Sequence, residues 1–191
     1  MNYFYQKNDS NRLVVLFHGT GGNEYQLLQP LGEILKGADI LSFEGNYGTG
    51  FSRRFFPPLV NGALDRPAFD KAVQDFITLY NEMNLIYDDI TFIGYSNGAN
   101  FIIGLMEQGL YMNHTVLLHP SNLNYDVSAA SKGIHVIVTA GANDHMVSPG
   151  QVKQLELEFK SHFENVQFEL FDGGHELTFE EVETIASKLN H

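Results

Sequence analysis

Short apolar runs alternate with longer amphipathic segments along most of the chain. The runs are rich in aliphatic residues, as is typical of parallel strands covered on both faces. They lie at residues 13–17, 40–43, 90–93, 115–118, 134–139 and 166–171. Between them, apolar residues at helical spacing predict helices over residues 24–35, 67–83, 97–108, 149–163 and 178–189.

Strands that alternate with helices predict an α/β fold with a mostly parallel sheet and helices on both faces. The length of 191 residues suits one domain, so residues 1–191 are expected to form a single unit. Such folds bind ligands beyond the carboxyl ends of their strands. Chemistry is therefore expected in the residues that directly follow each apolar run.

Three local signals add detail to this outline. Asp65 is placed to cap the helix predicted at 67–83. Ser148 is placed to cap the helix predicted at 149–163, with Pro149 in the first turn of that helix. Residues 3–6 are expected to pair antiparallel with the run at 13–17, because a polar turn separates the two.

Composition and charge narrow the range of partners and compartments. The formal net charge is −12, which repels nucleic-acid phosphates and anionic lipid, so neither is an expected partner. Residues 1–10 are polar and lack the apolar core of a signal peptide, and no run reaches the roughly 18 apolar residues that span a bilayer. A cytoplasmic protein is expected. The absence of cysteine excludes disulfides, cysteine-ligated metals and cysteine nucleophiles.

The strongest chemical signal is Gly-Tyr-Ser-Asn-Gly at residues 94–98, directly after the run at 90–93. This G-x-S-x-G pattern between a strand and a helix is typical of a nucleophile elbow, a tight turn that exposes the serine hydroxyl above the sheet. Small flanking residues are needed because a side chain there would collide with neighbouring backbone. Ser96 is thus the candidate nucleophile, with a simple helix cap as the alternative.

An acid and a base follow in the expected order. Asp144 lies past the run at 134–139, and His175 lies past the last run, after two glycines. The chain order serine, aspartate, histidine is the order of α/β-hydrolases. His175 would accept the Ser96 proton and Asp144 would hold the imidazole in the right tautomer. Asp172 competes for the acid role, but it lies in the same loop as the histidine.

The loop after the first run, at residues 17–23, is rich in glycine, so its backbone amides can approach a substrate. The amide of Thr20 and the amide of Asn97, at the start of a helix, are the candidate oxyanion-hole donors. Phosphate binding is the alternative for this loop, but it lacks the P-loop and G-x-G-x-x-G spacings.

Histidines and aromatic residues supply further candidates. Among eight histidines, His18 is expected to pin its loop, and His119 either lines the site or makes a structural hydrogen bond. No H-E-x-x-H or comparable pair occurs, so neither a metal nor a cofactor is implied. An aromatic group after the run at 40–43 is either core or the wall of a substrate pocket. The candidate substrate-binding residues are Tyr47, Phe51, Phe55, Phe56 and, beside the acid, Met146.

Taken together, these motifs resemble the phospholipase/carboxylesterase family of small α/β-hydrolases, and within it the bacterial carboxylesterases of the methylhydroquinone-resistance type. The matching segments lie at residues 18–24, 44–56, 94–100, 118–120, 141–144 and 174–175. The resemblance implies a minimal α/β-hydrolase fold without a lid domain, acting on short-chain carboxylic esters. It also implies a Ser96, Asp144 and His175 triad, oxyanion donors at Thr20 and Asn97, and a homodimer.

The sequence departs from that family in two places. Ser148 comes before Pro149 after the acid, where many relatives have proline sooner, and residues 49–58 match loosely. The family includes acyl-protein thioesterases and lysophospholipases, so these activities are alternatives to a short-chain esterase. A non-catalytic receptor with this fold is disfavoured because all three triad positions are filled. Dienelactone hydrolases use a cysteine nucleophile, which this chain lacks.

Overall fold

The computed structural model describes residues 1–189. Its centre is a seven-stranded sheet in the order β1-β3-β2-β4-β5-β6-β7, in which β1 is antiparallel to its neighbour and every other pairing is parallel. The strands are β1 Tyr3–Gln6, β2 Arg12–Phe17, β3 Asp39–Phe43, β4 Asp89–Tyr95, β5 His114–Leu118, β6 His135–Gly141 and β7 Asn165–Phe171. All six predicted strand runs are confirmed, as is the parallel sheet.

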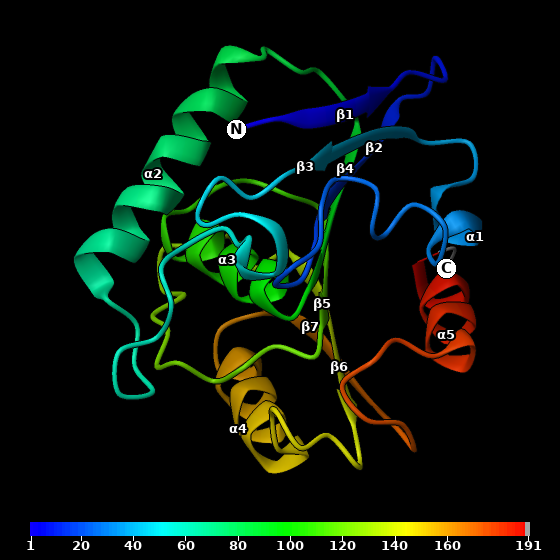
Figure 1. Cartoon of the computed structure of the whole chain (residues 1–191). Helices are drawn as coiled ribbons and strands as arrows, with labels where there is room; N and C mark the ends of the chain where they lie inside the picture. The colour runs from blue at the N-terminus through cyan, green and yellow to red at the C-terminus, as the bar shows by residue number, and fades with distance from the viewer. Residues whose placement is uncertain (190–191) are drawn as a thin grey trace.

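Helices cover both faces of the sheet, as predicted (Figure 1). The helical segments are α1 Gly32–Leu35, the 3-10 turn η1 Gly50–Ser52, α2 Arg66–Glu82, α3 Asn97–Glu107, α4 Pro149–Lys160 and α5 Phe179–Leu189. Buried side chains of α2, α3 and α4 form one apolar cluster with one face of the sheet, and those of α1 and α5 form a second cluster on the opposite face. The two apolar layers hold the strand ends in a fixed array.

The predicted hairpin between the first two strands is wrong. β1 pairs antiparallel with β3, with Tyr3 opposite Phe43, while β2 lies inside the sheet between β3 and β4. Both edges of β2 are therefore occupied by parallel partners, which leaves no edge for β1. The turn before β2 is fastened to the start of β3 instead, because the backbone N–H groups of Asn8 and Ser10 donate to Asp39 Oδ1 at 2.8 and 3.1 Å.

The first predicted helix is mostly absent. Only Gly32–Leu35 is helical, and residues 24–31 form a series of turns. The backbone N–H groups of Gln26 and Leu28 bond three residues back, to Asn23 O and Tyr25 O, and only that of Leu31 bonds four residues back in the α-helical way, to Leu27 O. Pro30 explains the difference, because it has no N–H to donate and disfavours helical geometry in the residue before it.

The predicted caps are confirmed. The Asp65 side chain accepts a hydrogen bond from Ala68 N at the start of α2, and Ser148 accepts one from Gln151 N at the start of α4. Both helices carry proline in their first turn. These two ends therefore follow from local chemistry alone.

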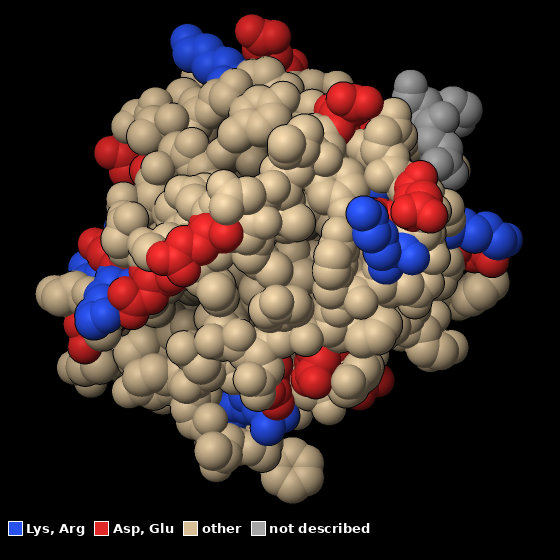
Figure 2. All heavy atoms as spheres, turned by 90° about the horizontal axis from the view of Figure 1, so that it is seen from above, with Lys and Arg blue, Asp and Glu red and all other residues tan. Residues whose placement is uncertain are grey.

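Figure 2 shows acidic and basic side chains scattered over the face that it draws, with uncharged surface between them. None of the helices in residues 1–189 is long and apolar enough to cross a membrane.

Candidate active site

Ser96 occupies the sharp turn between β4 and α3. Its φ is +52° and its ψ is −109°, a conformation that non-glycine residues rarely adopt. A Cβ atom at Gly98 would collide with the backbone carbonyl of Phe17, and one at Gly94 would meet the backbone of Gly98. The predicted strand–turn–helix context is confirmed, and glycine at both flanking positions is a steric requirement.

Three loops bring Ser96, His175 and Asp144 together. The Nε2 atom of His175 lies 2.8 Å from Ser96 Oγ, and its Nδ1 atom lies 2.7 Å from Asp144 Oδ2. Ser96 follows β4, Asp144 follows β6 and His175 follows β7. Because these strands are parallel, their carboxyl ends lie at one edge of the sheet, and the three residues lie close together there. The distances suit proton transfer along a hydrogen-bonded chain.

The Asp144 carboxylate is buried and held by several donors. Its Oδ1 atom accepts hydrogen bonds from the backbone N–H groups of Met146 and Val147 at 2.8 and 2.9 Å. Burial acts to raise the pKa of Asp144, but the hydrogen bonds from Val147, His175 and Met146 outweigh it and lower that pKa below its usual 3.8. Asp144 is thus an ionised acceptor facing His175 at neutral pH.

The competing acid, Asp172, lies elsewhere in the His175 loop. Its side chain is exposed, and its backbone carbonyl accepts a hydrogen bond from Asn143 Nδ2 at 2.7 Å. His175 Nδ1 points at Asp144 instead. The geometry therefore favours Asp144 for the acid role.

The two expected oxyanion donors lie beside Ser96. In the glycine-rich loop the N–H of Gly19 donates to Gln26 Oε1, that of Gly21 to Arg53 O and that of Gly22 to Gly19 O. Within residues 1–189 the Thr20 N–H has no such acceptor, and Thr20 lines the cavity that contains Ser96. Asn97 is the first residue of α3, where backbone N–H groups have no partner in their own helix.

His18 fixes the loop that carries Thr20, as predicted. Its Nε2 atom accepts from Gly45 N at 2.9 Å, so the proton is on Nδ1, which donates to Gly19 O at 2.6 Å. Burial lowers the pKa of His18, which keeps the ring neutral as this pattern requires. The loop after β2 is thereby tied to the end of β3.

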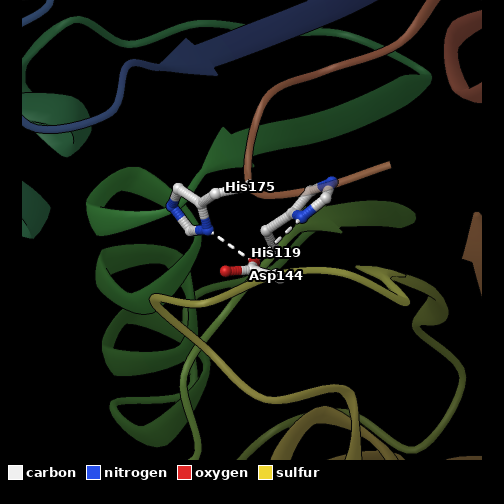
Figure 3. A group of neighbouring side chains, drawn as sticks. All are labelled: His119, Asp144 and His175. Atoms are coloured by element: carbon white, nitrogen blue, oxygen red, sulfur yellow. Dashed lines mark hydrogen bonds and ion pairs between the residues drawn. The ribbon is translucent and has the colours of Figure 1, made fainter. Parts of the chain in front are cut away.

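A second buried histidine lies against the same carboxylate. The Nδ1 atom of His119 is 3.4 Å from Asp144 Oδ2 (Figure 3). Its Nε2 atom is 3.1 Å from Glu181 Oε2. His119 therefore makes structural hydrogen bonds and does not line the cavity, which settles the two sequence alternatives for it. The sequence analysis did not identify Glu181.

The signal for Glu181 was present in the chain. Thr178-Phe179-Glu180-Glu181 matches the S/T-x-x-E pattern of a capping box, which places Glu181 at the start of a helix but not against the site. His119, Asp144 and His175 also offer potential metal-ligating atoms within 4.8 Å of one another. The sequence predicts no metal, and chelation of the purified protein is the experiment that distinguishes the two possibilities.

A cavity of about 520 Å³ opens beside Ser96. Its lining consists of residues from the four loops described above: Thr20, Tyr95, Ser96, Asn143, His145, Met146, Gly174, His175 and Glu176. Met146 is 76% exposed, so this wall stands open to solvent. Of the predicted substrate-binding residues, Met146 is the one that the structure places in this cavity.

The predicted aromatic wall is wrong for Phe55 and Phe56, which are core residues. Phe55 stacks on Phe101 with ring centroids 5.2 Å apart, and Phe56 packs edge-to-face on Phe69 at 4.8 Å. The reason is that the loop after β3 folds back on itself through the bridge between residues 47 and 54, and so turns both rings inward.

Neither of the other two aromatic candidates lines the cavity beside Ser96, although the backbone of Phe51 lies close to Gly21 of the glycine-rich loop. Tyr47 borders a separate cavity of about 360 Å³ beside α2, and Phe51 is 99% exposed. Conversely, the sequence analysis missed Tyr95 as a site residue, although it lies inside the G-x-S-x-G motif. Its hydroxyl donates to the backbone carbonyl of His175 at 2.8 Å and so holds the histidine loop.

Comparison with known proteins finds hydrolases that share this fold. The model of the dienelactone hydrolase family matches residues 60–186. MhqD, a provisionally assigned hydrolase of Bacillus subtilis (strain 168), is 28% identical over 190 residues, which is 96% of this chain and 94% of that protein. The carboxylesterase of Bacillus cereus is 29% identical with a TM-score of 0.83, covering 100% of this chain and 93% of its own.

A third relative is the Agrobacterium tumefaciens str. C58 protein Atu2452, of unknown function. It is 31% identical with a TM-score of 0.81, over 95% of this chain and 91% of that chain. These matches show that the chain has the α/β-hydrolase fold without an added domain. The sequence analysis set dienelactone hydrolases aside for want of a cysteine, but that absence bears on the nucleophile and not on family membership, since serine stands in the elbow.

Proposed function

Because the chain belongs to the dienelactone hydrolase family and is a hydrolase with carboxylesterase-like relatives, we propose that it is a serine-dependent carboxylesterase acting on short-chain esters. The observation that carries this proposal is the hydrogen-bonded chain from Ser96 Oγ through His175 to Asp144, with distances of 2.8 and 2.7 Å. The elbow geometry of Ser96 supports it further, since a hydroxyl on such a turn faces a substrate rather than the core.

The reaction would proceed through an acyl-enzyme. His175 Nε2 takes the proton of Ser96 Oγ as the oxygen attacks the ester carbonyl. The backbone N–H groups of Thr20 and Asn97 stabilise the oxyanion that forms. The tetrahedral intermediate collapses, the bond to the alcohol oxygen breaks and His175 returns its proton to that oxygen. Water then attacks the acyl-Ser96 carbonyl with His175 again as base, which releases the acid and restores the serine.

The preference for short acyl groups rests on the shape of the site. The cavity beside Ser96 is open, and Met146 is its exposed apolar residue. Phe55 and Phe56, which could have lengthened an apolar pocket, are in the core. A short acyl or alcohol group can contact Met146, whereas a long chain would extend into solvent and gain little burial energy.

Two measurements test the proposal. A fluorophosphonate should add one adduct to the purified protein, mapped by mass spectrometry to the Ser96 peptide, and Ser96→Ala should abolish it while remaining folded. Initial rates on nitrophenyl esters from acetyl to palmitoyl, beside a matched thioester, should be highest for short esters. Labelling that persists in Ser96→Ala would contradict the nucleophile. Rates that keep rising toward palmitoyl, or a preference for the thioester, would favour a lysophospholipase or a thioesterase.

A further inference from the structure

Asp144 faces two histidines, of which the proposed reaction uses one. His175 contacts Asp144 Oδ2 at 2.7 Å, and His119 approaches the same oxygen from the other side at 3.4 Å. Both rings direct Nδ1 at the carboxylate (Figure 3). The side chain of His119 is 1% exposed and that of Glu181, on its far nitrogen, is 0% exposed. A buried imidazole between two buried carboxylates is costly to assemble, so its position calls for an explanation.

Counting protons shows what His119 does to Asp144. Asp144 is ionised, so its Oδ2 atom can only accept, and the approach of His119 Nδ1 is favourable only if that nitrogen carries a proton. One proton lies in the hydrogen bond between His119 Nε2 and Glu181 Oε2. Either His119 is the imidazolium and Glu181 is ionised, or His119 is neutral and Glu181 is protonated. In both cases Nδ1–H donates to Asp144, and the pair together has no net charge.

The Glu181 carboxylate contacts His119 instead of making the capping-box hydrogen bond that its position in the helix would allow. In a capping box the glutamate reaches back to the backbone of the cap residue. Here the Thr178 side chain accepts from Glu181 N at 3.2 Å, but the Glu181 carboxylate points into the protein, where Oε2 meets His119 and Oε1 has no partner among the described residues. Glu181 therefore gives up a helix-end hydrogen bond and orients His119 instead.

We propose that His119 and Glu181 are positioning residues that extend the chain of Ser96, His175 and Asp144 to five members ending on α5. His119 would hold Oδ2 of Asp144 in place for His175, as the amides of Met146 and Val147 hold Oδ1. This inference rests on the proposed function, because it assigns these residues a part in activating Ser96.

The contact between His119 and Asp144 also changes how strongly the negative charge of Asp144 stabilises the protonated form of His175. The titratable groups that face His119 are Asp144 from the loop after β6, Glu181 from α5, His175 from the loop after β7 and Tyr95 from the end of β4. Burial raises the pKa of Tyr95 to about 12, so this phenol stays neutral. The positive end of the His119–Glu181 pair faces Asp144. Without that pair the full carboxylate charge acts on His175 and favours its protonated form.

The test measures the rate at which a fluorophosphonate labels Ser96 as a function of pH, because this rate depends on His175 and not on which ester is the natural substrate. The double variant His119→Leu/Glu181→Leu removes the donor and leaves no orphan charge. The matched variant His119→Asn/Glu181→Gln keeps an N–H near the position of Nδ1, and asparagine tolerates the φ of +52° at this residue. Glu156→Gln, a buried glutamate on α4 paired with two lysines, is the control for loss of a buried carboxylate.

The Leu/Leu variant should label about tenfold more slowly at its plateau, which is the order of loss found when groups that orient metal-ligating histidines are removed. The midpoint of its pH profile should move to higher pH. The Asn/Gln variant should recover most of the plateau, and Glu156→Gln should match wild type. A folded Leu/Leu variant with the wild-type plateau and midpoint would overturn the proposal, and so would an Asn/Gln variant that is equally impaired.

A second measurement needs no variant to fold. Nitrogen NMR of the wild-type protein with labelled histidine should show His119 Nδ1 protonated between about pH 5 and 9. A lone pair on that nitrogen in this range would also overturn the proposal. If wild type is not labelled at Ser96 at all, the proposed esterase fails, while the NMR result still decides whether His119 donates to Asp144.

Discussion

The Nδ1 atom of His175 lies 2.7 Å from Oδ2 of Asp144, which joins the loop after β7 to the loop after β6. Asp172 is closer to His175 along the chain, yet it does not make this contact. Separation along the sequence is a poor guide here. His175 and Asp144 follow neighbouring parallel strands and meet at the edge of the sheet, whereas Asp172, in the same loop as His175, faces outward.

Asp144→Asn should therefore lower turnover of a short nitrophenyl ester by about 10⁴, as loss of the acid does in serine proteases, because the histidine is left in the wrong tautomer. Asp172→Asn is the matched change in the same region and should cost less than about threefold. Steady-state rates at neutral pH, with folding checked by thermal melts, compare the two. A larger collapse in Asp172→Asn would show that the acid has been assigned to the wrong residue.

Chelation tests the metal alternative raised by the cluster of His119, Asp144 and His175. Dialysis against a strong chelator should leave the esterase rate unchanged, because a serine nucleophile with a histidine base needs no metal. Metal content is measured in the same samples before and after dialysis. A large loss of rate that zinc restores would identify the cluster as a metal site and contradict the triad.

Gly98→Ala should destabilise the fold by about 1–3 kcal/mol and impair the site, because the added methyl group meets the backbone of Phe17 and His18 and neither can yield cheaply. Gly150 also lies in the first turn of a helix, but nothing lies within 4 Å of a Cβ there. Gly150→Ala should be neutral or stabilising by up to about 1 kcal/mol. Urea unfolding of both variants measures the difference, and equal stabilities would refute the steric argument.

Asp39 should make the stability of the protein depend on acid pH. Burial acts to raise the pKa of Asp39, but hydrogen bonds from Tyr87, Asn8 and Ser10 outweigh it and lower that pKa below 3.8. A depressed folded-state pKa contributes stability that is present above 3.8 and is lost as the pH falls through the lower folded value.

Asp39→Asn should therefore cost about 1–3 kcal/mol at pH 7, since a charged acceptor is replaced, and the cost should shrink in acid. Asp75→Asn, which breaks an exposed ion pair with Lys71, should cost less than about 0.5 kcal/mol at either pH. Denaturant unfolding near pH 7 and near pH 3 gives both differences. A cost for Asp39→Asn that does not change with pH would contradict the assigned protonation.

Much of the site could be predicted because its signals are local. The turn at Ser96 needs glycine two residues to either side, and a serine, an aspartate and a histidine each follow an apolar run. Parallel strands end at a common edge, so residues just past those ends must be neighbours once the order of strands allows it. The caps at Asp65 and Ser148 were predictable for the same reason, since each acts on an amide within three residues.

Other features depended on competition between distant segments. The sequence of residues 3–6 indicates a strand but does not indicate which strand it pairs with. Both edges of β2 are paired with β3 and β4, so β1 cannot pair with β2. Phe55 and Phe56 were apolar in any case, but only the reversal of their loop decided that they pack in the core rather than against a substrate.

Glu181 shows the division most clearly. The sequence by itself determined that it begins a helix, because Thr178 stands three residues before it. It also determined the tight turn at Ser96, the chain order of Ser96, Asp144 and His175, and the alternation of strands and helices that builds the sheet. Only the tertiary structure decided that Glu181 faces His119, and through it Asp144, because that contact joins α5 to the loops after β5 and β6. Such contacts depend on how layers of helices pack against the sheet, and no short segment of the chain encodes that.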